Sequence, residues 1–283
     1  MTIAEAKSRA ENELSEAGYV HARREVEIFL THILNQDSAW IFTHEDAELD
    51  PPAAAALSQG VKQRIAGEPI AYIVGEQSFM GWIFKTDKRA LIPRPETEQL
   101  TELVVRELRN RQKQTGKFLE IGTGAGAIAI ALKKYFPHCE VTATDISDEA
   151  LELAEENAKR LNVSIDFVES DLFKDVPVAK YDLIVANLPY VPTQKLEFVS
   201  EQILDWEPMV AIEAGDDGLK YLIPFLKEAP KYLAENGIIA VEFWHTHGEP
   251  VRELVKTLLP DHQVAIEKDL AGFDRYAIIT PGE

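Results

Sequence analysis

The four residues Asn187-Leu188-Pro189-Tyr190 follow an apolar run at positions 181–186, and their types suit the binding of a planar nitrogen group. The Asn187 side-chain oxygen and the Leu188 backbone carbonyl can accept the two N–H hydrogens of an amino or amide group. Pro189 stiffens the backbone, and the Tyr190 ring can pack on the plane of the bound group. We therefore predict that this tetrapeptide is the catalytic acceptor site.

A glycine-rich loop at positions 120–126 precedes this tetrapeptide in the chain. Its three glycines let the backbone turn tightly and approach a ligand that side chains would exclude. Asp145 follows the last glycine by about 20 residues, the spacing at which an acid binds ribose hydroxyls in dinucleotide folds. The alternatives are a turn without a ligand and an acid that caps a helix. The loop residues that we expect to contact a cofactor are Glu120, Gly122, Thr123, Gly124, Ala125 and Gly126.

The loop alone would also suit a dinucleotide, but the acceptor tetrapeptide favours S-adenosylmethionine, because hydride transfer has no use for paired carbonyl acceptors. An amide nitrogen is a poor nucleophile, so its site has to orient it and stabilise the positive charge that grows on it. Asp171 and Leu172, which follow another candidate strand, and Asn187 are further expected cofactor contacts. The two motifs together predict an N-methyltransferase.

The elements that position these residues fall into three regions. Residues 1–69 have apolar positions at three- and four-residue spacing, which predicts a small helical domain. Residues 70–92 alternate and contain a turn candidate at Met80-Gly81, which indicates a β-hairpin or extended linker. Residues 93–283 alternate between strand and helix patterns and are the predicted methyltransferase domain.

The alternating region predicts a doubly wound α/β sheet of Rossmann type. Six residues separate the last two candidate strands, too few for a crossover helix, so the final strand should be antiparallel. Ser147 is the expected N-cap of one helix and Gly237 the expected C-cap of another. The candidate strands are Lys117–Ile121, Glu140–Thr144, Ser164–Val168, Tyr181–Ala186, Ile238–Phe243, Gln263–Lys268 and Arg275–Thr280, and the helices between them are Ala127–Tyr135, Asp148–Leu161, Leu219–Glu235 and Glu249–Leu258.

The candidate site residues all follow strands of this sheet. In doubly wound sheets the ligand lies beyond the carboxyl ends of the strands, where the winding reverses. The glycine loop follows the first strand, Asp145 ends the second, Asp171 follows the third and Asn187 ends the fourth. We expect these four elements to meet at one edge.

Composition narrows the class of protein and its partners. The net charge of −19 argues against nucleic acid, which is held by clustered Lys and Arg, although it does not exclude a local basic patch. A single cysteine, Cys139, allows no intramolecular disulfide. The polar N-terminus lacks the apolar core of a signal peptide, and no segment is long enough to span a membrane, so we expect a cytoplasmic enzyme.

Three other residues lie outside these motifs. His245 and His247 have the spacing of metal ligands, but no third ligand is evident, and a solvated loop with no metal is the better interpretation. Glu242 lies inside an apolar strand near the same sheet edge, and either a role at the site or a partly exposed strand end explains it.

Four segments together resemble the family of peptide chain release factor glutamine methyltransferases (PrmC/HemK), and the likeness runs along nearly the whole chain. Its most specific part is Pro93-Arg94-Pro95-Glu96-Thr97-Glu98, which separates this family from the enzymes that methylate a ribosomal protein. The other segments are 67–75, the glycine loop and 187–190. The resemblance implies a seven-stranded methyltransferase domain, with residues 1–69 as a helical N-terminal domain for substrate recognition. It also implies S-adenosylmethionine as cofactor, class 1 release factors as protein partners, and N5-methylation of Gln in their Gly-Gly-Gln loop.

Two residues depart from the family pattern. Leu188 replaces the first proline of Asn-Pro-Pro-Tyr, and the resulting tetrapeptide is also found in ribosomal RNA adenine dimethyltransferases. Leu172 stands where the family commonly has a tryptophan that stacks on adenine. The alternatives left open are a ribosomal-protein glutamine methyltransferase, an adenine N6-methyltransferase that acts on nucleic acid, and a binding protein that retains the fold without activity.

Overall fold

The computed structural model describes residues 1–282, which form two compact units. One unit comprises residues 1–76 together with 201–206, and the other comprises residues 77–200 and the chain from 207 onwards. A short segment that is distant in sequence therefore belongs with the N-terminal helices. No helix within residues 1–282 combines the length and apolar character needed to cross a membrane.

The N-terminal unit is built from helices α1 (Ile3–Glu16), α2 (Ala22–Leu34), α3 (Ser38–Thr43), α4 (Pro51–Ile65) and α5 (Ile70–Val74), with α9 (Glu201–Trp206). The apolar faces of α1, α2 and α4 meet in a core that contains Leu14, Phe29 and Leu30. A Cβ on Gly60 would lie 3.1 Å from the Phe29 ring, so a small residue there lets α4 and α2 approach closely. Side-chain caps from Thr2, Asp37 and Asp50 begin α1, α3 and α4.

A buried arginine joins α9 to this unit. Arg64 of α4 pairs through Nε with Glu25 at 2.6 Å, and its Nη1 donates to the side-chain oxygen of Gln202 at 3.1 Å. Its guanidinium also lies 4.2 Å from the centre of the Tyr19 ring. The planar, multidentate guanidinium thus connects two N-terminal helices and α9.

The segment predicted to be a hairpin or extended linker starts with a helix instead. Residues 70–74 form α5, because Pro69 sets a favourable entry to its first turn and Gly75, at a φ of +72°, ends it in the left-handed conformation. The hairpin follows as β1 (Glu76–Phe79) and β2 (Trp82–Lys85), with Met80 and Gly81 at the turn.

The second unit contains a seven-stranded sheet in the order β5-β4-β3-β6-β7-β9-β8. The sheet is parallel from β5 to β7, and β9 runs antiparallel to both neighbours, as predicted from the short connection. Its strands are β3 (Lys117–Ile121), β4 (Glu140–Asp145), β5 (Asp166–Glu169), β6 (Tyr181–Ala186), β7 (Leu233–Glu242), β8 (His262–Lys268) and β9 (Asp274–Pro281).

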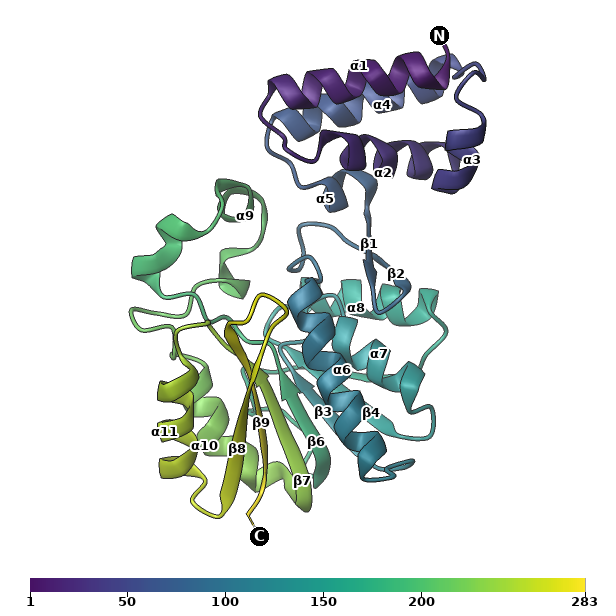
Figure 1. Cartoon of the computed structure of the whole chain (residues 1–283). Helices are drawn as coiled ribbons and strands as arrows, with labels where there is room; N and C mark the ends of the chain where they lie inside the picture. Colours follow the sequence, from purple (N-terminus) through teal and green to yellow (C-terminus); the bar gives the residue numbers. More distant parts are fainter. Residues whose placement is uncertain (283) are drawn as a thin grey trace. The chain divides into compact units, whose positions relative to one another are not determined.

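Helices cover both faces of this sheet, as Figure 1 shows. Consecutive residues of a strand point to opposite faces, so Phe118 packs with α6 and α7, whereas Leu119 packs with α10. The helices are α6 (Pro95–Asn110), α7 (Ala127–Tyr135), α8 (Asp148–Arg160), α10 (Leu222–Tyr232) and α11 (Gly248–Leu258), and short 3-10 turns span Thr193–Phe198 and Met209–Ala211.

One predicted helix end is wrong. Gly237 is not a C-cap but lies inside β7, because α10 ends at Tyr232 and the chain becomes extended from Leu233. Pro230 in the last turn of α10 cannot donate a hydrogen bond to the Leu226 carbonyl, which weakens the end of this helix. The predicted cap at Ser147 is confirmed, since its side chain accepts from the Ala150 N–H at 3.2 Å.

Candidate functional site

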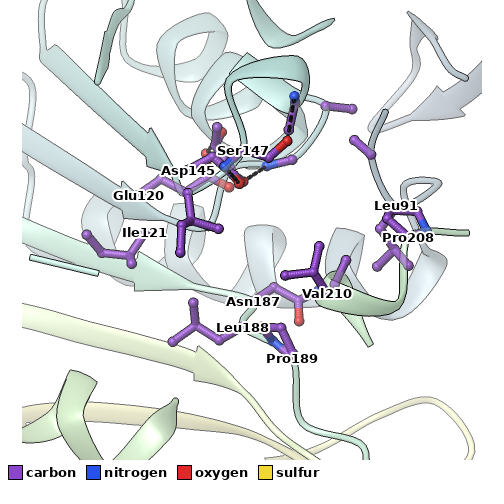
Figure 2. Close-up of a pocket in the computed structure, with 18 of the residues that line it drawn as sticks. Leu91, Glu120, Ile121, Asp145, Ser147, Asn187, Leu188, Pro189, Pro208 and Val210 are labelled. Atoms are coloured by element: carbon purple, nitrogen blue, oxygen red, sulfur yellow. Dashed lines mark hydrogen bonds between the residues drawn. The ribbon is translucent and has the colours of Figure 1, made fainter. Parts of the chain in front are cut away.

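A cavity opens at the carboxyl ends of β3, β4 and β6, where the chain order of the sheet reverses. Figure 2 shows Asp145 and Ser147 on one side of it, Asn187–Pro189 on another, and Leu91 with Pro208 on a third. The structure thus brings together the predicted residues Glu120, Gly122, Thr123, Gly124, Ala125, Asp145, Asp171, Leu172, Asn187, Leu188 and Pro189.

The glycine loop has the backbone conformation that only glycine adopts easily. Gly122, Gly124 and Gly126 have φ values of +75°, +53° and +82°. A Cβ on Gly122 would lie 3.0 Å from the Leu188 side chain, and one on Gly126 would lie 3.1 Å from Ala154 of α8. Gly122 thus allows the acceptor tetrapeptide to pack against the loop, and Gly126 supports helix packing without lining the cavity.

Asp145 holds the glycine loop in place. One carboxylate oxygen accepts from the Gly124 N–H at 2.8 Å and the other accepts from the Ser147 N–H at 3.0 Å. Burial raises the pKa of this carboxyl group. A carboxylate oxygen has a second lone pair, so these contacts leave acceptor capacity toward the cavity that Asp145 lines.

Glu120 is buried at the end of β3, between the loop and helix α7. Its Oε2 accepts from the Thr123 hydroxyl at 2.7 Å and from the Ala129 N–H at 2.8 Å. Burial raises the pKa of this carboxyl group to about 8, against the opposing effect of the two hydrogen bonds. Glu120 also lines the cavity, where a cationic ligand would favour its ionised form.

The acceptor tetrapeptide presents two oxygen atoms that have no protein donor within residues 1–282. These are the side-chain oxygen of Asn187 and the backbone carbonyl oxygen of Leu188. Both residues line the cavity, and the Leu188 side chain is buried against the loop and the core beneath it. These are the two oxygen atoms that the sequence predicts as hydrogen-bond acceptors for a ligand.

Hydrogen bonds behind the cavity fix the Asn187 side chain. Its Nδ2 donates to the Thr97 hydroxyl at 2.8 Å, and that hydroxyl donates to Glu242 Oε2 at 3.0 Å. The Tyr190 hydroxyl donates to Glu242 Oε1 at 2.9 Å. Glu242 therefore has a role behind the site rather than at a partly exposed strand end, since it is only 3% exposed. Burial raises its pKa to about 7.

Tyr190 differs in position from its three neighbours in the tetrapeptide. It is not among the residues that line the cavity, and its ring lies 6.3 Å from that of Trp244. Burial raises the pKa of its hydroxyl well above the usual value, and the nearby Glu242 carboxylate adds to this. In this structure Tyr190 therefore supports Glu242, and stacking on a substrate stays a prediction.

A second wall of the cavity comes from residues that sequence reasoning missed. Glu207 accepts from the Ile92 N–H at 3.0 Å and pairs with Arg94, which fixes the segment before α6. The residues after it, Pro208 and Val210, line the cavity. No local pattern marks Glu207, because its partners are more than a hundred positions earlier in the chain.

Asp171 and Leu172 follow strand β5. Leu172 has a φ of +52°, an unusual conformation for a residue with a side chain. The Ser170 hydroxyl donates to the Leu172 carbonyl at 2.9 Å and accepts from the Asp175 N–H at 3.0 Å, which stabilises this turn. Strained backbone of this kind is frequent at ligand sites.

The two histidines do not form a solvated loop together. His247 is buried, with 8% of its surface exposed, and precedes helix α11, whereas His245 is half-buried between Trp244 and Phe273. The interpretation as a solvated loop is wrong for His247, because its ring packs closely against Gly218 and is removed from solvent. No group of three metal-binding side chains occurs in residues 1–282.

The chemistry of the cavity fits S-adenosylmethionine. The carboxylates of Asp145 and Asp171 can accept from ribose hydroxyls, and Glu120 can offset positive charge. The closely packed glycine backbone gives access that a Cβ would block. The apolar side chains that can cover a flat base are Leu91, Ile92, Ile146, Leu172 and Val210.

Comparison with known proteins agrees with this geometry. Residues 93–206 match the methyltransferase small domain, and residues 5–75 match the PrmC N-terminal domain. A methyltransferase from Pyrococcus furiosus shares the fold, with a TM-score of 0.54 and 21% identity over 80% of this chain and all of that one.

Curated relatives are more closely similar. The release factor glutamine methyltransferase of Koribacter versatilis is 35% identical over 98% of both chains. The enzyme of the same name from Streptococcus pneumoniae is 41% identical over 78% of both chains. The cavity with its glycine loop and paired acceptors, the fold and these similarities lead to one conclusion: the chain is an S-adenosylmethionine-dependent enzyme that belongs to the release factor glutamine methyltransferase family.

Proposed function

We propose that this enzyme transfers a methyl group to the side-chain amide nitrogen (N5) of the Gln in the Gly-Gly-Gln loop of class 1 peptide chain release factors. The observation that carries the proposal is the pair of unpartnered oxygen atoms on Asn187 and Leu188 beside the glycine loop. A primary amide has two N–H donors, so this pair matches it. The names of the curated relatives identify a release factor as the protein that would present the amide.

The site residues divide into a cofactor wall and an acceptor wall. Asp145 and Asp171 would accept hydrogen bonds from ribose, and the glycine loop would approach the rest of the cofactor. When bound, S-adenosylmethionine supplies an electrophilic methyl group on a sulfonium ion. Asn187 and Leu188 would hold the Gln nitrogen with its lone pair directed at that methyl group.

The two acceptors would act mainly in the transition state. An amide nitrogen that bonds to a methyl group loses conjugation with its carbonyl and gains positive charge. The Asn187 and Leu188 oxygens then stabilise its more acidic N–H groups more strongly than in the ground state. As the C–N bond forms, the bond between the methyl group and sulfur breaks and its electron pair stays on sulfur, which leaves a neutral thioether. One of the two N–H hydrogens of the methylated amide is then lost to water as a proton.

Methyl mapping tests the proposal. Purified enzyme is incubated with isotopically labelled S-adenosylmethionine and a class 1 release factor, and the labelled residue is identified by mass spectrometry. We expect one methyl group on the Gln of the Gly-Gly-Gln loop and none on a release factor in which that Gln is replaced by Asn. Label on other residues, or none, would contradict the proposal.

The enzyme variant Asn187→Ala provides the matched control for the site. We expect its turnover to fall far more than its affinity for S-adenosylmethionine, because the lost contact strengthens in the transition state. Ribosomal protein and adenine-containing RNA are offered in parallel reactions. Preferred methylation of either would favour that substrate instead, although the net charge of −19 argues against RNA.

A further inference from the structure

The hydroxyl of Thr97 lies between the Asn187 amide and the Glu242 carboxyl group. It is 2.8 Å from Asn187 Nδ2 and 3.0 Å from Glu242 Oε2, and Thr97 is buried at 6% exposure in the first turn of α6. A hydroxyl has one hydrogen to donate and lone pairs that accept. The direction of that one hydrogen decides which end of the Asn187 amide can face Thr97.

An ionised Glu242 can only accept hydrogen bonds. The Thr97 hydrogen then points to Glu242, and the Thr97 oxygen can only accept from Asn187. The amide group must place its NH₂ toward Thr97 and its oxygen toward the cavity. This is the orientation that a substrate N–H requires.

A protonated Glu242 removes this constraint. Its own O–H can donate to Thr97, whose hydrogen is then free to bind the Asn187 oxygen. The amide can turn over and place its NH₂ in the cavity. Two donors, one from Asn187 and one from the substrate, then face each other, and an unmade hydrogen bond is costly in a buried site.

We propose that Thr97 and Glu242 are positioning residues that set the polarity of the Asn187 side chain and so keep an acceptor in the cavity. The inference rests on the proposed function in one respect, namely that Asn187 accepts an N–H of the substrate. Glu242 does not line the cavity, and the hydroxyl of Thr97, which does, is engaged with Asn187 and Glu242, so both residues act through Asn187.

The charged and titratable groups around Glu242 come from three elements. Tyr190 donates to it, Arg275 of β9 favours its ionised form, and Glu96 of α6 opposes that form. Tyr276, paired with Glu242 across β7 and β9, donates its own hydroxyl hydrogen to the Glu96 carbonyl at 2.7 Å. With a pKa of about 7, Glu242 changes its protonation near neutral pH.

The test compares two variants of the full-length enzyme that differ by the hydroxyl. Thr97→Val keeps the shape of the side chain and removes the donor and acceptor, whereas Thr97→Ser keeps both. We expect kcat to fall roughly tenfold or more in Thr97→Val, with the affinity for S-adenosylmethionine within twofold of the wild type, and to recover in Thr97→Ser. Thermal melting in the presence of the cofactor checks that both variants fold.

The pH profile separates positioning from a structural role. The wild type should gain kcat as pH rises through about 7, because Glu242 ionises there, and Thr97→Val should have a low, flat profile over that range. A wild type that fails to methylate Gln would refute the proposed function. An active wild type whose activity needs Asn187, beside a Thr97→Val variant with unchanged kcat and pH profile, would refute this inference alone. Equal losses in Thr97→Val and Thr97→Ser would also refute it.

Discussion

At the scale of single residues, the cavity combines buried carboxyl groups with acceptors that have no internal partner. Glu120 and Glu242 each have a pKa raised by burial, to about 8 and about 7. They lie in different parts of the site: Glu120 lines the cavity under the glycine loop, and Glu242 lies behind Asn187. Each therefore connects protonation to a different step, the first to cofactor binding and the second to the orientation of the acceptor.

The protonation of Glu120 predicts a pH-dependent affinity for S-adenosylmethionine. Below about 8 the carboxyl group of the free enzyme holds a proton, and a cationic cofactor has to displace it. The affinity gained from Glu120 should therefore rise with pH up to about 8 and then level off. Because the cofactor's own amino group also titrates, the measurement is the ratio of the dissociation constants of wild type and Glu120→Gln by calorimetry.

Calorimetry in buffers of different ionisation enthalpy adds a second observation. The wild type should release a proton on binding at pH 7, and Glu120→Gln should release less. Identical pH dependence and proton release in the two proteins would show that Glu120 does not change its protonation on binding, and the prediction would be wrong.

These residue-scale features were only partly predictable from sequence. The acceptor pair followed from the residue types of 187–190, because two carbonyl oxygens match two N–H donors. Thr97 was visible only as part of a motif, since its partners Asn187 and Glu242 are 90 and 145 positions away. Its role depends on the direction of one hydrogen atom, which no sequence pattern encodes.

At the scale of elements, the site depends on two neighbouring strands and the loops that leave them. Strands β3 and β6 pair in parallel, with Ile121 opposite Ala186, so the loops that follow them start side by side. The Leu188 side chain packs into the space that Gly122 leaves open. The glycine loop and the tetrapeptide are thus one packed unit.

The Leu188→Pro variant should retain methyltransferase activity. The acceptor that we propose at this position is the backbone carbonyl, and the Leu188 N–H donates to no group within residues 1–282, so proline removes no hydrogen bond. We expect kcat to stay within a few-fold of the wild type. The lost contact of the buried leucine with Gly122 and the core should lower stability by about 1–2 kcal/mol, partly offset by a stiffer unfolded chain.

A competition assay tests whether Leu188 affects the choice of substrate. Release factor and adenine-containing RNA are offered together to the wild type and to Leu188→Pro. Both proteins should prefer the release factor. A wild type that prefers RNA, with a variant that switches to Gln, would mean that Leu188 marks a change of substrate.

Most elements of the second unit were predictable, because buried parallel strands and amphipathic helices have distinct periods. The strands at 117–121 and 181–186 and the helix at 127–135 have the predicted bounds. Helix α5 and the early end of α10 were not recognised. The first depends on Pro69 and Gly75 at its ends, and the second on Pro230 in the last turn. The membership of α9 in the N-terminal unit could not be predicted, because it rests on contacts between distant segments.

At the scale of the whole molecule, the ionisation of buried Glu242 should reduce stability as the pH rises. The pKa of Glu242 is about 7 in the folded chain, above its ordinary value, so the folded state holds a proton that the unfolded state has released. The free energy of unfolding should therefore fall as pH rises through roughly 4.5–7, by at most about 3 kcal/mol from this group.

Removal of the negative charge of Glu242 should stabilise the folded protein above pH 7. Glu242→Gln cannot ionise but can accept from Thr97 with its amide oxygen and donate to Tyr190 with its nitrogen. We expect the difference in unfolding free energy between variant and wild type, measured by urea denaturation, to grow in favour of the variant from pH 5 to pH 8. A constant difference over this range would contradict the expected sign of the pH dependence.

Helix α9 sets a limit on the exchange of parts between related enzymes. The chain leaves the catalytic unit after position 200, supplies Gln202 to Arg64 among the N-terminal helices, and returns at Glu207, which holds Ile92 and Arg94 at the cavity wall. Consider a chimera in which only residues 1–76 come from a related enzyme. The residue at position 64 then comes from that enzyme, whereas α9, which it contacts, still comes from this one. Exchange of the whole N-terminal unit should therefore require two inserts, the N-terminal helices and the six residues of α9, even though these segments lie far apart in the gene.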